Sequence, residues 1–192
     1  TVMTWRQVNP NWAATPLLLF GPGTASGTFD YFTQAVNGTE GASRTDYTPS
    51  EDDNVIVQGV ITNPGGVGYF GYAYFDQNRS RLKALGVDGV VPSAETIASG
   101  AYPLARPIFI YVNADMLQRP QVRRFVQYYV QNAGRLATDV GYVGLSESAY
   151  ATLLTRVTER QAGTAFGGHQ EVGVNIDEVL ARPLGVTATP AQ

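Results

Sequence analysis

A glycine-rich turn carries the most informative residues of the sequence. In the stretch Phe20-Gly-Pro-Gly-Thr-Ala-Ser-Gly-Thr-Phe29, a short apolar run ends and an amphipathic segment begins near Ser26. Free backbone amides in the first turn of a helix converge on one point, where the helix dipole adds about half a positive charge. The Ser26 and Thr28 hydroxyls supply further donors, and Gly27 lets an oxyanion approach the main chain closely. The pattern predicts a site for a phosphate-like oxyanion that needs neither a metal nor a lysine.

Other interpretations of this turn remain open from the residues alone. Ser26 or Thr28 could cap the helix without binding a ligand. A hydrolase would use Ser26 as its nucleophile, although the Gly-x-Ser-x-Gly elbow is missing. The sole histidine, His169, lies in a glycine-rich stretch that is typical of a solvated surface residue. Nucleophilic catalysis is therefore a weaker prediction than anion binding.

Two common nucleotide motifs do not fit. A P-loop requires Gly-Lys-Ser/Thr, and the only lysine of the chain is Lys83, outside any such motif. The dinucleotide pattern is approximated by Gly21-x-Gly23-x-x-Ser26, but its third glycine is a serine. Nucleotide binding is therefore a weak prediction.

Composition excludes several other classes of function. The 192 residues include 13 basic and 16 acidic side chains, a net charge of −3, and no basic run marks a nucleic-acid interface. The absence of cysteine excludes disulfides, thiolate metal sites, iron–sulfur clusters and thiol nucleophiles. Three acidic residues at 51–53 are those expected in the first turn of a helix. Neither a metal nor a cofactor is expected.

The elements that position the turn follow from hydrophobic patterning. A buried strand is predicted over Leu17–Phe20. A helix should run from Ser26 to Asn37 with Phe29, Phe32 and Val36 facing inward. The next helix is predicted to begin at Ser50, through a capping box with Asp53.

Further elements alternate along the chain until residue 112 and are mainly helical afterwards. An α/β layer followed by helices that need another surface is therefore expected. Apolar runs are too short to span a membrane, and no signal peptide is visible, so a processed or internal start is expected. The predicted strands are 67–70, 82–87 and 107–112. Residues 71–77 are predicted as a short helix or turn, and the further predicted helices are 92–99, one opening at Arg119-Pro120, and 146–160.

Several collinear segments resemble the phosphate-binding proteins that serve phosphate-specific ABC importers. One is Gly21-Pro-Gly-Thr-Ala-Ser-Gly-Thr-Phe-Asp-Tyr-Phe32, which is similar to the phosphate-contacting turn of that family. The resemblance extends from Trp5 to Glu178 and includes residues 44–54, 66–71, 94–100 and 102–112.

The resemblance implies an α/β fold of the type II periplasmic-binding-protein kind, in which each lobe has a mixed sheet flanked by helices. Residues 1–106 would form the second lobe, which carries the anion-binding turn. Residues 107–192 would be a crossover strand and C-terminal helices that pack on a first lobe absent from this chain. The chain would then be either cleaved or natively split from that lobe.

The resemblance also implies the ligand contacts. Ser26, Gly27 and Thr28 match the family's Ser-Gly-Thr, and the amide of Ala25 is a further candidate. Many members have an arginine at the position of Pro22, so a different charge partner is needed here. Arg44 is the substitute candidate, with a surface pair to Asp46 as the alternative.

The implied function is non-enzymatic capture of inorganic phosphate outside the cytoplasm, for delivery to an ABC permease. The implied partners are phosphate, a complementary N-terminal lobe chain and the membrane permease. A phosphate-ester hydrolase, an interaction module with a vestigial cleft, and transport of sulfate or another oxyanion are the alternatives. The carboxylate with which the family selects phosphate has no match among these residues.

Overall fold

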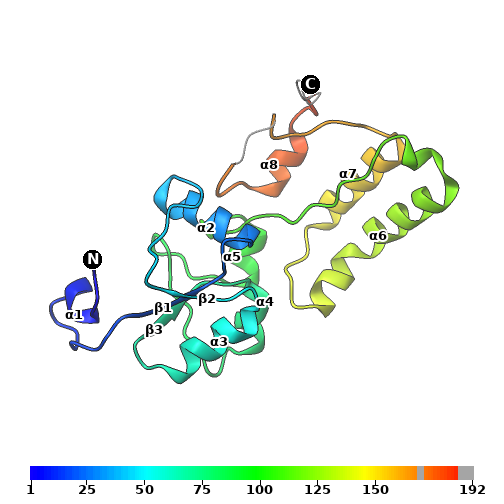
Figure 1. Ribbon diagram of the computed structural model, residues 1–192. Coiled ribbons are helices and arrows are strands. Elements are labelled where there is room, and N and C mark those ends of the chain that lie inside the picture. The colour runs from blue at the N-terminus through cyan, green and yellow to red at the C-terminus, as the bar shows by residue number, and fades with distance from the viewer. Residues whose placement is uncertain (168–170, 186–192) are drawn as a thin grey trace. The chain divides into compact units, whose positions relative to one another are not determined.

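The structure is a computed structural model that describes residues 1–167 and 171–185. It divides into two compact units, Thr1–Ala84 (unit 1) and Leu85–Gln192 (unit 2), which are described separately (Figure 1). The predicted boundary after residue 106 is a different one: it assigns residues 1–106 to one lobe of a two-lobe protein and residues 107–192 to packing on the other. That assignment stays a prediction.

Unit 1 is built on a small parallel sheet of three strands in the order β2-β1-β3. The central strand β1 (Leu18–Gly21) pairs with β2 (Thr48–Pro49) on one side and β3 (Gly66–Gly68) on the other. The helices of this unit are α1 (Trp5–Val8), α2 (Gly27–Asn37), α3 (Asp53–Thr62) and α4 (Tyr72–Gln77).

Helices cover both sides of this sheet. The chain crosses from β1 to β2 through α2, and then from β2 to β3 through α3. Since these crossovers run in opposite directions and parallel crossovers are right-handed, the two helices belong on opposite faces. Figure 1 shows α2 above the strands and α3 below them. Because the three strands are parallel, the segments that follow them meet at the carboxyl edge of the sheet. These segments begin at Pro22, Ser50 and Tyr69.

The core of unit 1 lies between the sheet and its helices. Ile56 and Val57 of α3 are each 1% exposed, and Gly59 has its Cα against the ring of Phe20 in β1. In α2, Phe29, Tyr31 and Thr33 are buried. The hydroxyl of Thr33 donates to the Phe29 carbonyl at 2.8 Å, so its burial leaves it satisfied.

The prediction that Val36 faces inward is wrong, because this side chain is 55% exposed. It lies in the last turn of α2, which ends at Gly38 in the left-handed conformation (φ 71°). The buried face instead turns toward Tyr31 and Thr33, which the hydrophobic pattern did not select.

The predicted start of α3 at Ser50 is also wrong. The Ser50 amide donates to the Gly21 carbonyl at 3.0 Å and so continues the pairing of β2 with β1. The helix begins only afterwards, with Asp52 as its N-cap and the Asn54 amide donating to that carboxylate at 2.9 Å. The short strand β2 was absent from the sequence prediction.

Unit 2 is mainly helical within its described residues. It contains α5 (Ala94–Ala98), the 3-10 helix η1 (Met116–Gln118), α6 (Pro120–Asp139), α7 (Glu147–Thr158) and α8 (Ile176–Ala181). Helices α6 and α7 form an antiparallel pair joined by a short loop (Figure 1). Its buried residues are Leu117, Val126, Val130, Ala149 and Val179.

Two strand predictions in this part of the chain are wrong. Residues 107–112 form no strand, since no described residue pairs with them, and Tyr111 is 94% exposed. The β propensity of branched and aromatic side chains becomes a strand only when a partner strand is present. Residues 82–87 end in a single bridge between Val87 and Val90, across a tight turn with positive φ at Asp88 and Gly89.

The hydrophobic pattern also predicts that Phe125 and Val126 of α6 and the leucines of α7 face inward, and this prediction is correct only in part. Phe125 is 65% exposed although its neighbour Val126 is buried, and the leucines of α7 are half-buried. None of the helices within the described ranges is long and apolar enough to cross a bilayer. The sequence also predicts a mobile tail past Arg182, and from residue 186 on this tail lies outside the described residues.

Candidate anion-binding site

The turn between β1 and α2 has the geometry that the sequence predicts. Gly21, Pro22 and Gly23 are buried at the end of β1, and the chain then reverses so that the Ser26 amide donates to the Gly23 carbonyl at 3.1 Å. Ser26 has extended backbone dihedrals (φ −103°, ψ 126°) and is the N-cap of α2. The tight turn places the first amides of α2 at the carboxyl edge of the sheet, where open parallel sheets bind ligands.

The predicted ligand residues differ in how free their donors are. The Thr28 amide already donates to Ser26 Oγ at 3.1 Å. The Gly27 amide, on an exposed residue, has no acceptor within the part of the chain that the structure describes. The Ala25 amide donates to a Glu51 carboxylate oxygen at 3.4 Å. These four consecutive residues form one corner, in which Ala25 and Gly27 are exposed and the two hydroxyl residues are half-buried.

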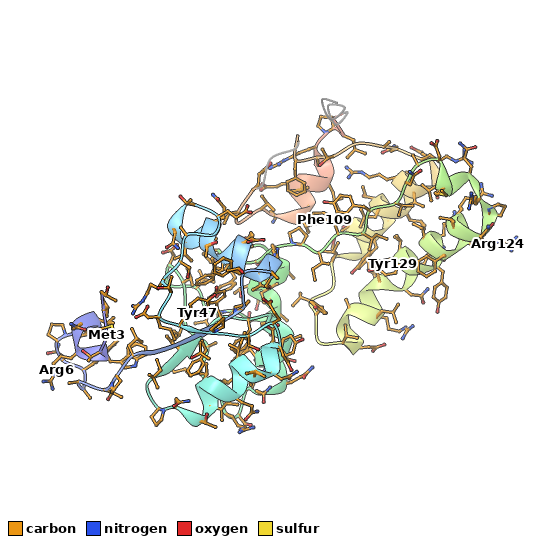
Figure 2. The ribbon with its side chains drawn as sticks, in the orientation of Figure 1. Met3, Arg6, Tyr47, Phe109, Arg124 and Tyr129 are labelled. Carbon is orange, nitrogen blue, oxygen red and sulfur yellow. The ribbon has the colours of Figure 1, made fainter. Side chains whose placement is uncertain are left out.

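Arg44 lies elsewhere in unit 1. Its guanidinium forms two hydrogen bonds to Asp46, at 2.8 and 2.6 Å, and a third, at 2.8 Å, to the carbonyl of Val2. The neighbouring Met3 carbonyl accepts from Leu17, which precedes β1, so this arginine lies toward the amino end of the strand. Figure 2 shows Met3 beside α1, well away from Tyr47 near the strands. The described contacts of Arg44 are those of the alternative interpretation, a surface pair with Asp46.

Glu51 is the neighbour of the turn that sequence reasoning did not select. It follows β2 by two residues, and the pairing of Gly21 with Pro49 brings it to the turn. Its carboxylate lies against Gly23, where a Cβ would collide with an Oε1 atom. The missing signal was β2 itself, since only the strand register relates residue 51 to residue 25.

Aromatic side chains support the turn from within. The Tyr47 hydroxyl donates to the Pro22 carbonyl at 3.0 Å. Tyr69, which follows β3, stacks on Phe32 of α2 with ring centroids 3.8 Å apart, and its ring lies against Gly21. The Tyr69 hydroxyl is buried and has no hydrogen-bond partner among the described residues. These contacts fix the position of the turn relative to α2 and β3.

Burial changes the titration of two groups at the same edge of the sheet. Burial raises the pKa of Tyr69 to about 12, so its hydroxyl stays protonated at neutral pH. Burial also raises the pKa of Asp53, against the opposing effect of the Gly71 amide that donates to its carboxylate. The nearby charge of Asp52 raises it further.

The acidic side chains near the turn make other contacts. Among residues 1–167 and 171–185, no group of three His, Asp or Glu side chains is arranged to hold an ion. The acidic run 51–53 is divided among a turn contact, a helix cap and a half-buried carboxyl group. His169 lies outside the described residues, so its predicted exposure is not tested.

Comparison with known proteins decides the family. Residues 1–133 match the PBP superfamily domain. The chain belongs to the PBP superfamily. A solved relative, described as a possible phosphate binding protein from Planctomyces limnophilus, is 42% identical and superposes with a TM-score of 0.70 over 84% of this chain and 60% of its own. The predicted fold class, a periplasmic-binding-protein-like α/β lobe, is thereby confirmed.

Two curated relatives match most of this chain, and one of them is named a phosphate-binding protein. Protein SphX of Synechococcus elongatus is 44% identical over 92% of this chain and 54% of its own length. Phosphate-binding protein PstS of Staphylococcus haemolyticus is 35% identical over 77% of this chain and 48% of its own. The resemblance drawn from the sequence is confirmed. The chain spans about half the length of these curated relatives.

Proposed function

We propose that this PBP superfamily chain is part of a solute-binding protein that captures inorganic phosphate for an ABC importer. The observation that carries the proposal is the corner at residues 25–28, which faces the carboxyl edge of a parallel sheet in a chain whose relatives are named phosphate-binding proteins. The proposed role is binding without catalysis. It would take place outside the cytoplasm, where a binding protein delivers its solute to a permease.

The groups that we assign to phosphate binding are neutral hydrogen-bond donors, namely backbone amides and hydroxyls. The Gly27 amide and the Thr28 hydroxyl would donate directly to phosphate oxygens, and the Ser26 hydroxyl, whose oxygen accepts from Thr28, can direct its proton outward. The Ala25 amide would contribute once it is released from Glu51. Arg44 remains the candidate charge partner, and reaching the turn would require it to exchange its bonds to Asp46 and Val2.

The direct test is to titrate the chain with phosphate. Calorimetry measures the affinity, and the amide resonances of residues 25–28 in NMR spectra report where the ligand binds. Thr28→Val removes one hydroxyl donor and keeps the side-chain shape. A hydrogen bond to a charged group is worth about 1.5–3 kcal/mol, so affinity should fall about ten- to a hundredfold.

Thr62→Val is the matched control. This threonine bonds the Gln58 carbonyl within α3 at 2.7 Å, so the substitution should leave phosphate affinity unchanged. Equal affinity of Thr28→Val and the wild-type chain would contradict the assigned site. Turnover of an aryl phosphate that disappears in Ser26→Ala would instead establish the hydrolase alternative.

We further propose that residues 107–192 pack against a complementary lobe that lies outside these 192 residues. Support comes from apolar side chains that unit 2 leaves uncovered and from the relatives, which are nearly twice as long. Those side chains include Ile108, Phe109, Ile110, Tyr111, Phe125 and Tyr129. Figure 2 shows Phe109 on the segment that precedes α6, and Arg124 and Tyr129 on α6 itself. Native mass spectrometry would reveal a second polypeptide and a bound phosphate.

A further inference from the structure

The amide of Ala25 already has an anionic partner in the structure. Glu51 Oε1 accepts from it at 3.4 Å, although Glu51 is an exposed side chain that could extend freely into solvent. A carboxylate oxygen and a phosphate oxygen are equivalent acceptors for a backbone amide. Glu51 therefore occupies a position that the proposed ligand would require.

The fold places Glu51 next to the turn. Glu51 is held close to the turn because it lies between Ser50, which pairs with Gly21, and Asp52, which is the N-cap of α3. Gly23 has no side chain, so the carboxylate can lie directly over it. An alanine there would collide with Glu51 Oε1, and the carboxylate would have to leave the turn.

The negative charge of the Glu51 carboxylate opposes phosphate binding. Phosphate carries one to two negative charges near neutral pH, and a carboxylate within a few ångströms repels it. The two anions also compete for the same Ala25 donor. We propose that Glu51 is a resident competitor for the anion-binding turn, and that phosphate binds by displacing its carboxylate from the Ala25 amide. This inference rests on the proposed function and concerns the regulation of the same site.

The test compares phosphate affinity in wild type, Glu51→Gln and Glu51→Ala at low ionic strength. Gln keeps the length of the side chain and removes its charge, and Ala removes the acceptor as well. Because exposed charge pairs are worth about 0.2–1 kcal/mol, affinity should rise about 1.5- to fivefold in Glu51→Gln and at least as much in Glu51→Ala. The gain of Glu51→Gln should shrink in concentrated salt, which screens exposed charges.

Glu40→Gln is the matched control. It makes the same change in net charge on an exposed residue beyond the C-terminal end of α2, so it lies at the opposite end of that helix from the turn. It should leave affinity unchanged. Without phosphate, the Ala25 amide resonance should move in Glu51→Ala and stay in place in Glu40→Gln.

The outcomes of this test distinguish failure of the competitor role from failure of the proposed phosphate binding. If wild type binds phosphate and Glu51→Gln binds it equally or more weakly, the competitor role is overturned and the proposed function stands. A weaker Glu51→Gln would show that the carboxylate contributes to ligand binding. Failure of wild type and all variants to bind phosphate would overturn the proposed function, and this inference with it.

Discussion

At the scale of single residues, the candidate site depends on hydrogen bonds that its own neighbours already make. Ser26 Oγ holds the Thr28 amide, and the Tyr47 hydroxyl holds the Pro22 carbonyl. The Gly27 amide, by contrast, has no acceptor among the described residues. The turn therefore has its conformation before a ligand binds, and less conformational entropy is lost on binding.

The two tyrosines beneath the turn should respond oppositely to loss of their hydroxyls. Tyr69→Phe removes a buried hydroxyl that has no partner among the described residues, so stability should stay equal or rise. Tyr47→Phe breaks the bond to Pro22 and should lower the free energy of unfolding by about 1 kcal/mol. Urea denaturation of both variants checks this. A clear loss of stability in Tyr69→Phe would mean that its hydroxyl is hydrogen-bonded.

Asp53 and Asp46 should give pH dependences of opposite sign. Burial raises the pKa of Asp53, so folding disfavours its ionised form. Its cost to stability is absent below the ordinary pKa of 3.8 and becomes complete as pH rises through the raised value. Asp53→Asn should therefore melt at a higher temperature than wild type at pH 7, and the difference should vanish toward pH 3.

The hydrogen bond from Arg44 lowers the pKa of Asp46, so this carboxylate stabilises the fold above its ordinary pKa of 3.8. That stability is lost as pH falls through the lowered value. Asp46→Asn should melt slightly lower than wild type at pH 7, and the two should converge in acid. The effect is small because the pair is partly exposed. Melting curves between pH 3 and 7 that shift in the same direction for both variants would contradict these assignments.

At the scale of elements, local signals predicted more than non-local ones. The strand-turn-helix around Ser26 and the end of α2 at Asn37 were predicted because caps and turns are specified by residues next to each other. Thr48–Pro49 was missed because two residues with a proline carry no strand pattern, and their pairing with β1 depends on residues 28 positions away. Without β2, neither the start of α3 nor the approach of Glu51 to the turn could be predicted.

Contact between α3 and β1 makes a specific prediction for Gly59. Glycine inside a helix usually costs about 1 kcal/mol relative to alanine, so Gly59→Ala would stabilise a solvent-facing position. Here a Cβ would lie 2.5 Å from a ring carbon of Phe20, and the variant should be less stable than wild type. Thermal unfolding checks the sign. A stabilised Gly59→Ala would show that α3 packs less closely on β1 than the structure indicates.

At the scale of the whole molecule, unit 2 leaves several large apolar side chains exposed to solvent. Tyr111 and Phe125 are 94% and 65% exposed, so replacing both with serine should leave the melting temperature nearly unchanged. The same double variant should self-associate less than wild type in sedimentation velocity, because exposed aromatic surface drives association. Val36→Ser, at a position 55% exposed in unit 1, should behave like wild type. A double variant that self-associates as strongly as wild type would show that these two aromatic side chains are not part of an adhesive apolar surface.

The proline in β2 has a consequence for how this sheet could grow. Ser50 directs its amide at β1, so the nitrogen of Pro49 points to the opposite, outer side of the strand. That nitrogen carries no hydrogen, and an incoming strand would find no donor there. β3, which ends the sheet on the other side, carries no such block in Gly66–Gly68. Sheet extension, whether by a docking segment or by fibril-like stacking of copies, is therefore directed to the β3 flank.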